Sequence, residues 1–457
     1  MSRARTVADR ISAVVEQLRT RLAESQYSDS TIVVGTMLAL YALYVLFGLV
    51  LGFNFNGQVN ALQRITFLTA VFAMAGLALN LQWGYTGLFN VGVAGFMAVA
   101  VYVMGITTAP VNPDAVSATP GFGLPVPVGI GLGILAAAAA GLVVSLPALR
   151  LRADYLAIVT LGVSEIVRLS VSSSTLREFT LGGYTLGTGG NSGLGLTGDP
   201  SKLVREFYET GFGIGPLDAL SDGLASAFGG AGIERPVAIN VTYTFFVVLV
   251  LIVVYFTVRR LGNSPFGRNL KAIREDEQVA RALGKNTQWV KAKSFVIGCG
   301  LLGLAAIFWQ GSRGVTTPDT YLIELTVFVW IVVIIGGTGS NTGTVLGAAL
   351  FVGLLQEGPR FVRSVIKEAF EVPRAPESVV DATASTAGGD PLPLISYVFD
   401  QLAALQFVMM GVVLILIIHR RPDGIMGHRK EPASTLDITK PTSADESTTQ
   451  QEGAPDE

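Results

Sequence analysis

Long apolar runs separated by shorter polar stretches dominate the chain. A helix needs about 20 apolar residues to cross the ~30 Å hydrocarbon core of a bilayer. The clearest runs are Val237–Val258 and Tyr397–Ile418, and the weakest are interrupted by glycines and polar residues. The pattern predicts an all-α, polytopic integral membrane protein with about ten transmembrane helices, some of them broken at glycines. The expected spans are 32–53, 59–81, 84–106, 124–149, 154–172, 237–259, 292–312, 321–338, 343–359 and 400–419.

The composition supports this interpretation. Only 14% of the 457 residues are charged, whereas about a quarter are charged in a typical soluble domain. The single cysteine, Cys299, and the two histidines, His419 and His428, are too few for a Cys/His metal site. The net charge of −2 gives no reason to expect a nucleic-acid partner. We therefore expect neither a metal nor a nucleic acid.

The distribution of Lys and Arg predicts the orientation of the spans. With the N-terminus on the cytoplasmic side, 21 of the 32 basic residues fall in cytoplasmic segments and 9 in extracytoplasmic segments. Nine of the cytoplasmic ones lie between Arg259 and Lys293. We expect a multi-pass protein of the cell membrane with both termini in the cytoplasm.

Polar segments flank and divide one transmembrane domain, expected at residues 32–420. Residues 1–31 have apolar positions at helical spacing, which predicts an amphipathic cytoplasmic arm. Residues 421–457 are polar and acidic, and are expected to form a disordered cytoplasmic tail. The remaining polar segments are two extracytoplasmic loops, 173–236 and 360–399, and one large cytoplasmic loop, 260–291.

The cytoplasmic loop has the pattern of a short amphipathic helix. Ser264 and Pro265 offer a start, and Gly284 offers an end. Between them, apolar residues recur at roughly helical spacing. Such a helix could dock into a groove of a cytoplasmic partner, or it could simply anchor the loop to the membrane surface. The pattern alone favours neither.

Glycines interrupt the apolar pattern in two places. Asn80–Phe96 reads NLQWGYTGLFNVGVAGF, and Ile335–Ala348 reads IGGTGSNTGTVLGA. Glycines at membrane depth can serve close helix packing, or they can break a helix that lines a polar path. Gly-x-Thr-Gly occurs in both places, as in two halves of an internal duplication. The second segment is not a phosphate loop, because no Gly-Lys-Ser/Thr follows it.

Glu165 and Arg168 are three residues apart inside one expected span, so they lie on one helical face and can form an ion pair. Packing of the helix explains such a pair better than contact with a substrate does. The spans contain no line of carboxylates that could relay protons. This absence weakens the case for an ion-coupled secondary transporter, which is kept as an alternative function. A membrane scaffold or enzyme is a further alternative.

Five motifs in the same order resemble the branched-chain amino acid ABC permease family, of its M type. Within the stretch Ser264–Asn286, which resembles the family as a whole, Gln278–Gly284 is similar to a degenerate form of the Glu-Ala-Ala-x-x-x-Gly coupling motif. Both glycine-rich segments resemble family signatures, although Val93 stands where members commonly have His. Leu149–Leu169 and Gly189–Leu194 complete the set.

The resemblance implies a transporter subunit without an ATPase site of its own and with no bound cofactor. It implies a second permease subunit, two cytoplasmic ATP-binding subunits that hydrolyse ATP, and an extracytoplasmic solute-binding protein. The expected substrates are branched-chain amino acids or a related small polar solute such as urea or an amide.

From these motifs we expect three groups of residues to matter. The ATPase-coupling residues are Ala272, Ile273, Glu275, Glu277, Ala280, Ala282, Leu283 and Gly284. The residues of the substrate path are Asn80, Tyr85, Thr86, Asn90, Thr338, Ser340 and Asn341, and the structural glycines are Gly84, Gly87, Gly336, Gly337 and Gly339.

Overall fold

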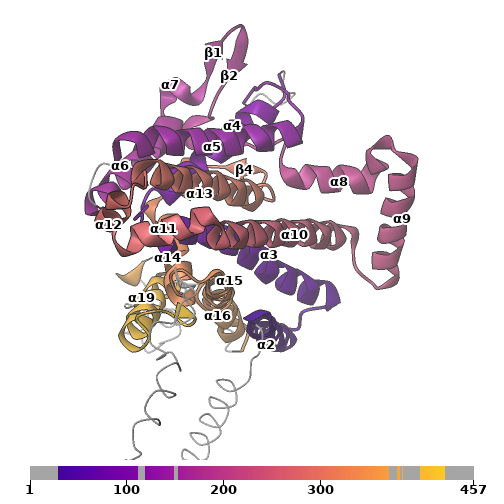
Figure 1. The fold of residues 1–457 in the computed structure, drawn as a ribbon. Coiled ribbons are helices and arrows are strands. Elements are labelled where there is room, and N and C mark those ends of the chain that lie inside the picture. Colours follow the sequence, from indigo (N-terminus) through magenta and orange to yellow (C-terminus); the bar gives the residue numbers. More distant parts are fainter. Residues whose placement is uncertain are drawn as a thin grey trace, which may run out of the picture.

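The computed structural model describes residues 29–111, 119–148, 153–369, 378–380, 383 and 402–427. Most of the expected N-terminal arm, most of the acidic tail and much of the 360–399 loop lie outside these residues. Within the described part, the regular structure is almost entirely helical (Figure 1). The prediction of an all-α polytopic membrane protein is confirmed.

Each expected span corresponds to an apolar helix. Eight helices in the described residues are long and apolar enough to cross a membrane, and shorter apolar helices at Val93–Thr108 and Met410–Arg420 match the other two. The helices are α2 (Asp29–Val50), α3 (Phe55–Leu79) with a π-helical turn η1 (Asn80–Gly84), α4 (Val93–Thr108), α5 (Val126–Ala148), α6 (Ala153–Ser172), α10 (Arg235–Asn263), α13 (Thr287–Gln310), α14 (Ile323–Gly336), α15 (Asn341–Leu350) with a π-helical turn η5 (Phe351–Gln356), α16 (Gly358–Ala369) and α19 (Leu402–Arg420).

Shorter elements occupy the connections. Two pairs of strands are antiparallel: the hairpin of β1 (Phe179–Leu181) with β2 (Tyr184–Leu186), and the long-range pair of β3 (Leu194–Gly195) with β4 (Val315–Thr316). The other short elements are α7 (Ser174–Arg177), η2 (Gly190–Ser192), α8 (Pro200–Thr210), η3 (Gly211–Gly213), α9 (Gly215–Gly230), α11 (Pro265–Glu275), α12 (Glu277–Ala282) and η4 (Pro318–Tyr321).

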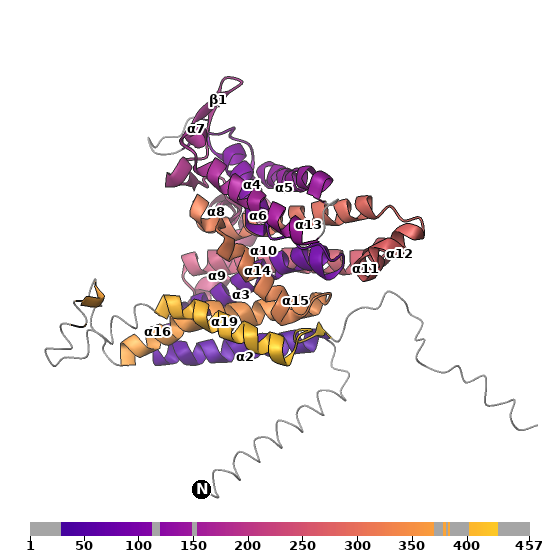
Figure 2. The ribbon, with the colours of Figure 1, turned by 90° about the vertical axis from the view of Figure 1, so that its left-hand side faces the viewer.

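Helix α3 forms the centre of the bundle. It packs against α10, α13, α14 and α15 (Figure 1), and 94% of its most apolar window is buried. A helix that is apolar all round is expected in such a position. Helix α2 packs on α15, α3 and α16 at the edge of the bundle (Figure 2). Helices α4, α5 and α13 form the opposite layer.

Small residues let α4 approach α6 closely. A Cβ on Gly92 would lie 2.4 Å from the carbonyl oxygen of Thr160, and one on Gly95 would lie 2.5 Å from the Cα of Ser164. Glycine is therefore required here for packing between helices, as is common in membrane bundles.

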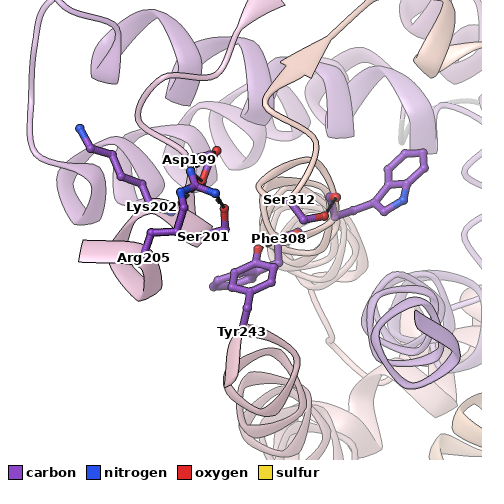
Figure 3. A network of polar contacts seen from close by, with 8 residues as sticks. Asp199, Ser201, Lys202, Arg205, Tyr243, Phe308 and Ser312 are labelled. Carbon is purple, nitrogen blue, oxygen red and sulfur yellow. Dashed lines mark hydrogen bonds and ion pairs between the residues drawn. The ribbon is translucent and has the colours of Figure 1, made fainter. Parts of the chain in front are cut away.

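The polar loops lie at opposite ends of the bundle. Helix α10 is 29 residues long, about 44 Å, with α9 before it and α11 after it (Figure 1). At the other end of the bundle, Asp199 is the N-cap of α8 and accepts a hydrogen bond from the Lys202 amide at 2.8 Å (Figure 3). The same carboxylate accepts from the Arg205 guanidinium at 3.2 Å. Nearby, the Tyr243 hydroxyl donates to the Phe308 carbonyl oxygen at 2.8 Å, which joins α10 to α13 (Figure 3).

Large apolar side chains cover the outer surfaces of several helices. Leu38 of α2, Leu135 and Val143 of α5, Ile158 of α6 and Phe245 of α10 are each at least 60% exposed. Apolar surface of this extent requires a bilayer or another subunit to cover it.

Candidate functional site

The first glycine break follows α3 directly. The helix widens into the π-helical turn η1 at Asn80–Gly84 and ends there, and Gly87 then takes a left-handed φ of 75°. Such widened turns are rare and often occur at functional positions. The expectation that Asn80–Phe96 interrupts a helix is confirmed.

The two glycine breaks contact each other. The side-chain oxygen of Asn80 accepts a hydrogen bond from the Gly339 amide at 2.8 Å, and its amide group donates to the Asn341 side-chain oxygen at 3.1 Å. Gly84 leaves room for this contact, because a Cβ there would lie 2.7 Å from the Gly339 nitrogen. We call this contact between the two breaks, made by Asn80, Gly84, Gly339 and Asn341, the glycine seam.

The other predicted path residues are mostly buried in the same region. Thr86 hydrogen bonds with Ser294 at 2.9 Å, Asn90 donates to the Gln82 side chain at 2.9 Å, and Ser340 caps α15 through the Gly343 amide at 3.0 Å. Thr338 is half-buried. Thr86, Asn90 and Ser340 thus have hydrogen-bond partners within the chain in the described conformation, and their role in a substrate path stays a prediction.

The second break depends on its glycines for close packing. A Cβ on Gly336 would lie 2.1 Å from the Gly343 carbonyl oxygen, so α14 and α15 could not approach as they do. Gly337 and Gly339 have φ values of 106° and 86°, a region that L side chains rarely adopt. Their structural role follows from this geometry.

The loop at residues 260–291 contains two helices, whereas the sequence pattern predicted one. Helix α11 ends at Glu275, Asp276 is extended, and α12 begins at Glu277. The Asp276 carboxylate accepts from the Gln278 and Val279 amides at 2.8 and 3.0 Å, which makes it the N-cap of a new helix. The expected end at Gly284 is correct, since its φ is 77°.

The predicted coupling residues separate into two sets. Ile273 and Ala280 are 5% and 3% exposed and hold the two helices against the rest of the chain, so they are not available to a partner in this conformation. Glu277 is half-buried. The exposed members are Ala272, Glu275, Ala282, Leu283 and Gly284. Val279, which was not among the predicted residues, is 54% exposed beside Leu283 at 74%.

Helix α11 also contacts the first glycine break. The Arg274 guanidinium donates a hydrogen bond to the Gly84 carbonyl oxygen. The Lys271 ammonium lies 5.6 Å from the centre of the Tyr85 ring, within the range of a cation–π interaction. Gly262, at the end of α10, would contact that ring at 2.9 Å if it carried a Cβ. Sequence reasoning missed Lys271 and Arg274, because nothing local relates them to residues 84 and 85.

Glu277 connects α12 to α13. Its carboxylate accepts from Lys291 at 3.0 Å and from Arg281 at 3.1 Å. Partial burial alone would raise the pKa of Glu277, but the hydrogen bond and charge of Lys291 outweigh it, so that the pKa lies below its usual value. The carboxylate is therefore charged at neutral pH and fixes α12 in place.

The predicted ion pair of α6 is present. Arg168 Nε donates to Glu165 at 2.9 Å, and Arg168 also lies 3.8 Å from Asp319 beyond the end of α13.

A second group of charges was missed by sequence reasoning: buried Glu357 accepts from Arg64 of α3 and Arg360 of α16, each at 3.1 Å. The interruption of the 343–359 segment by a glutamate was the available signal.

A profile of the branched-chain amino acid transport system / permease component family matches residues 61–418. The chain belongs to this family. It is 32% identical over 289 residues to the high-affinity branched-chain amino acid transport system permease protein LivM of Escherichia coli (strain K12), which covers 63% of the chain and 61% of that relative. It is also 23% identical over 393 residues to a probable branched-chain amino acid transport permease protein LivM of Methanocaldococcus jannaschii, covering 81% and 94%.

The family match includes both glycine breaks and the α11–α12 loop. LivM of Salmonella typhimurium is 31% identical over 289 residues and is covered over 61% of its length. The chain thus spans about three-fifths of the length of these bacterial relatives. No solved structure matches the chain.

Proposed function

We propose that the chain is a permease subunit of an ABC importer that carries branched-chain amino acids across the cell membrane. The family match over residues 61–418 carries this proposal, and the printed names of the relatives supply the substrate class. The ten apolar helices found among the described residues agree with it.

In this proposal the chain is not an enzyme and binds no cofactor. ATP is hydrolysed by two cytoplasmic partner subunits, a second permease subunit of the same family completes the membrane core, and an extracytoplasmic protein delivers the solute. The exposed apolar side chains of α12, Val279 and Leu283, support a docking surface for an ATP-binding subunit. The excess of Lys and Arg around residues 259–293 supports placing that loop, and both termini, in the cytoplasm.

The contacts of α11 suggest how movement would pass into the membrane. When the ATP-binding subunits close, they would displace α12 and α11 as one unit, because the two helices pack directly against each other. Arg274 and Lys271 would carry that displacement to Gly84 and Tyr85. The glycine seam would then shift or part, which would open the permease core to the other side.

Uptake of radiolabelled leucine into proteoliposomes tests this proposal. The vesicles contain the chain with its neighbouring permease, ATP-binding and solute-binding proteins. We expect accumulation that requires internal ATP and persists when ion gradients are collapsed. Uptake that survives without ATP but disappears with the ion gradient would overturn the ABC mechanism in favour of a secondary transporter. No uptake of any branched-chain amino acid would overturn the substrate class.

A further inference from the structure

A cavity of about 290 Å³ lies between α3, α13, η4, α14, η5 and α19. It is near the end of the bundle that lies opposite α11 and α12, since its lining includes the C-terminal end of α13 and the residues that follow. Its lining combines aromatic, carboxylate and amide side chains: Phe72, Trp309, Asp319, Glu324, Phe328 and Gln356. A concave, mostly apolar space with a few polar groups is the usual form of a small-molecule site.

The lining changes from buried to exposed across the cavity. Phe72 and Trp309 are 2% and 7% exposed and form the inner part, whereas the Asp319 side chain is 83% exposed and Glu324 is also exposed. Phe72 and Trp309 therefore lie deep, whereas the two carboxylates lie at the exposed side together with Leu322 and Phe407.

Two buried polar atoms of the lining residues have no hydrogen-bond partner within the described part of the chain. They are the Nε1–H donor of Trp309 and the side-chain oxygen of Gln356. A buried donor or acceptor without a partner costs about 1–3 kcal/mol, so native structures rarely retain one without a reason. Gln356 ends the π-helical turn η5, a type of turn that often occurs at functional positions.

A positive charge lies close to the donor. The guanidinium carbon of Arg313 is 4.7 Å from the centre of the Trp309 ring. The lining therefore offers a hydrogen-bond donor at Trp309, which has the Arg313 charge against its ring, and acceptors at Glu324 and Gln356. The rings of Phe72 and Phe328 provide an apolar wall.

We propose that this cavity is a binding subsite for the zwitterion of an apolar α-amino acid, in contact with Trp309, Glu324 and Gln356. The ammonium group faces the Glu324 carboxylate and the Gln356 oxygen, and the carboxylate accepts from Trp309 Nε1–H near Arg313. The aliphatic side chain packs against Phe72 and Phe328. This inference rests on the proposed function, since it places the imported solute on the permease itself.

Equilibrium binding to the full-length chain in nanodiscs, without any solute-binding protein, tests the subsite. The probes are radiolabelled leucine and two competitors with the same apolar group: 3-methylbutylamine, which lacks the carboxylate, and 4-methylpentanoate, which lacks the ammonium group. We expect each competitor to need about tenfold higher concentration than leucine, because each loses one charge-assisted contact.

Two variants assign the ends of the zwitterion. W309F should raise the Kd for leucine about tenfold and leave the inhibition constant of 3-methylbutylamine unchanged, because only the carboxylate uses the indole donor. E324Q should raise the Kd for leucine similarly and leave competition by 4-methylpentanoate unchanged. W289F, at the exposed far end of α13, and E178Q, an exposed carboxylate outside the cavity, are the matched controls.

The outcomes separate the subsite from the proposed function. Wild-type affinity for leucine in both W309F and E324Q would overturn the subsite, as would ATP-driven leucine uptake by a chain that binds no leucine in nanodiscs. Absent uptake, together with leucine binding that both variants weaken, would overturn the proposed function and leave the subsite in place. Glu324 is exposed, so E324Q gives a result even if W309F fails to fold.

Discussion

Arg274 of α11 donates a hydrogen bond to the carbonyl oxygen of Gly84, 190 residues earlier in the chain. This bond joins the α11–α12 loop to the first glycine break without any intervening element. The backbone carbonyl of Gly84 is available because η1 ends there and the next helix begins only at Val93. The unsatisfied end of one helix thus serves as the attachment point of another.

Replacing Arg274 by methionine should uncouple ATP hydrolysis from uptake. Methionine keeps an unbranched apolar stem and removes every donor, so the α11 displacement would no longer reach Gly84. We expect leucine uptake per ATP hydrolysed to fall about tenfold, with ATPase activity retained. The matched control is Arg268→Met, an exposed arginine of the same helix. Equal losses in both variants would contradict a specific role for Arg274.

Leu283→Asp and Ala280→Glu should impair different properties of the chain, namely binding to the ATP-binding subunits and folding stability. Leu283 is 74% exposed, so the chain with Leu283→Asp should retain its stability to within about 0.5 kcal/mol and bind the ATP-binding subunits about tenfold more weakly. Ala280 is 3% exposed, so Glu at this position would disrupt packing and lower the melting temperature. Co-purification and thermal denaturation of both variants check this difference. Normal co-purification of the Leu283→Asp chain would show that α12 is an anchor only.

Asn80→Leu should destabilise the glycine seam. The variant leaves the Gly339 amide and the Asn341 side-chain oxygen without their partner, at a cost of about 1–3 kcal/mol for each buried group. Thermal denaturation in detergent should show a lower melting temperature. Asn240→Leu, the same change at an exposed position of α10, should have little effect. Similar melting temperatures for the two variants would argue against the seam as a stabilising contact.

Stability should depend on pH through Glu277. The pKa of Glu277 is lowered in the folded chain. The contribution of this carboxylate to folding stability is therefore fully present above pH 4.5, the ordinary pKa of a glutamate, and it is lost as the pH falls through the lower pKa of the folded state. Glu277→Gln should therefore melt at a lower temperature than the wild type at pH 7, and this difference should shrink below about pH 4.5. A difference that stays constant down to pH 3.5 would show that the Lys291 contact is unimportant for stability.

The positions of the helices could be predicted because transfer of apolar residues into a bilayer is a local property of the sequence. The glycine breaks were predictable because glycines within an apolar run are also a local feature of the sequence. The stop at Gly284, just after α12, was predictable in the same way. The division between α11 and α12 was missed although Asp276 followed by Glu277 is a recognisable helix start. The apolar spacing continues across Asp276, and that periodicity concealed the cap.

The partners of buried polar groups could not be predicted. Asn80 and Gly339, or Arg64 and Glu357, are far apart in the sequence and meet only through the packing of α3 against the C-terminal helices. The cavity near Trp309 draws its lining from six separate segments, so no single stretch carries its pattern. Glycine and asparagine at residues 80–90 indicated a special region, but only the fold shows that it is closed by residues 337–341.

The bond between Asn80 and Gly339 also bears on biosynthesis, since 259 positions separate the two residues. At about 5–20 residues per second, the ribosome reaches Gly339 on the order of 13–52 s after Asn80. During that interval α3 is in the membrane while the side-chain amide of Asn80 still lacks its native hydrogen-bond partner. A membrane helix with such an unpaired polar group is a target for quality-control proteases. The yield of this chain in a cell should therefore depend on whatever shelters its first half until the second half arrives.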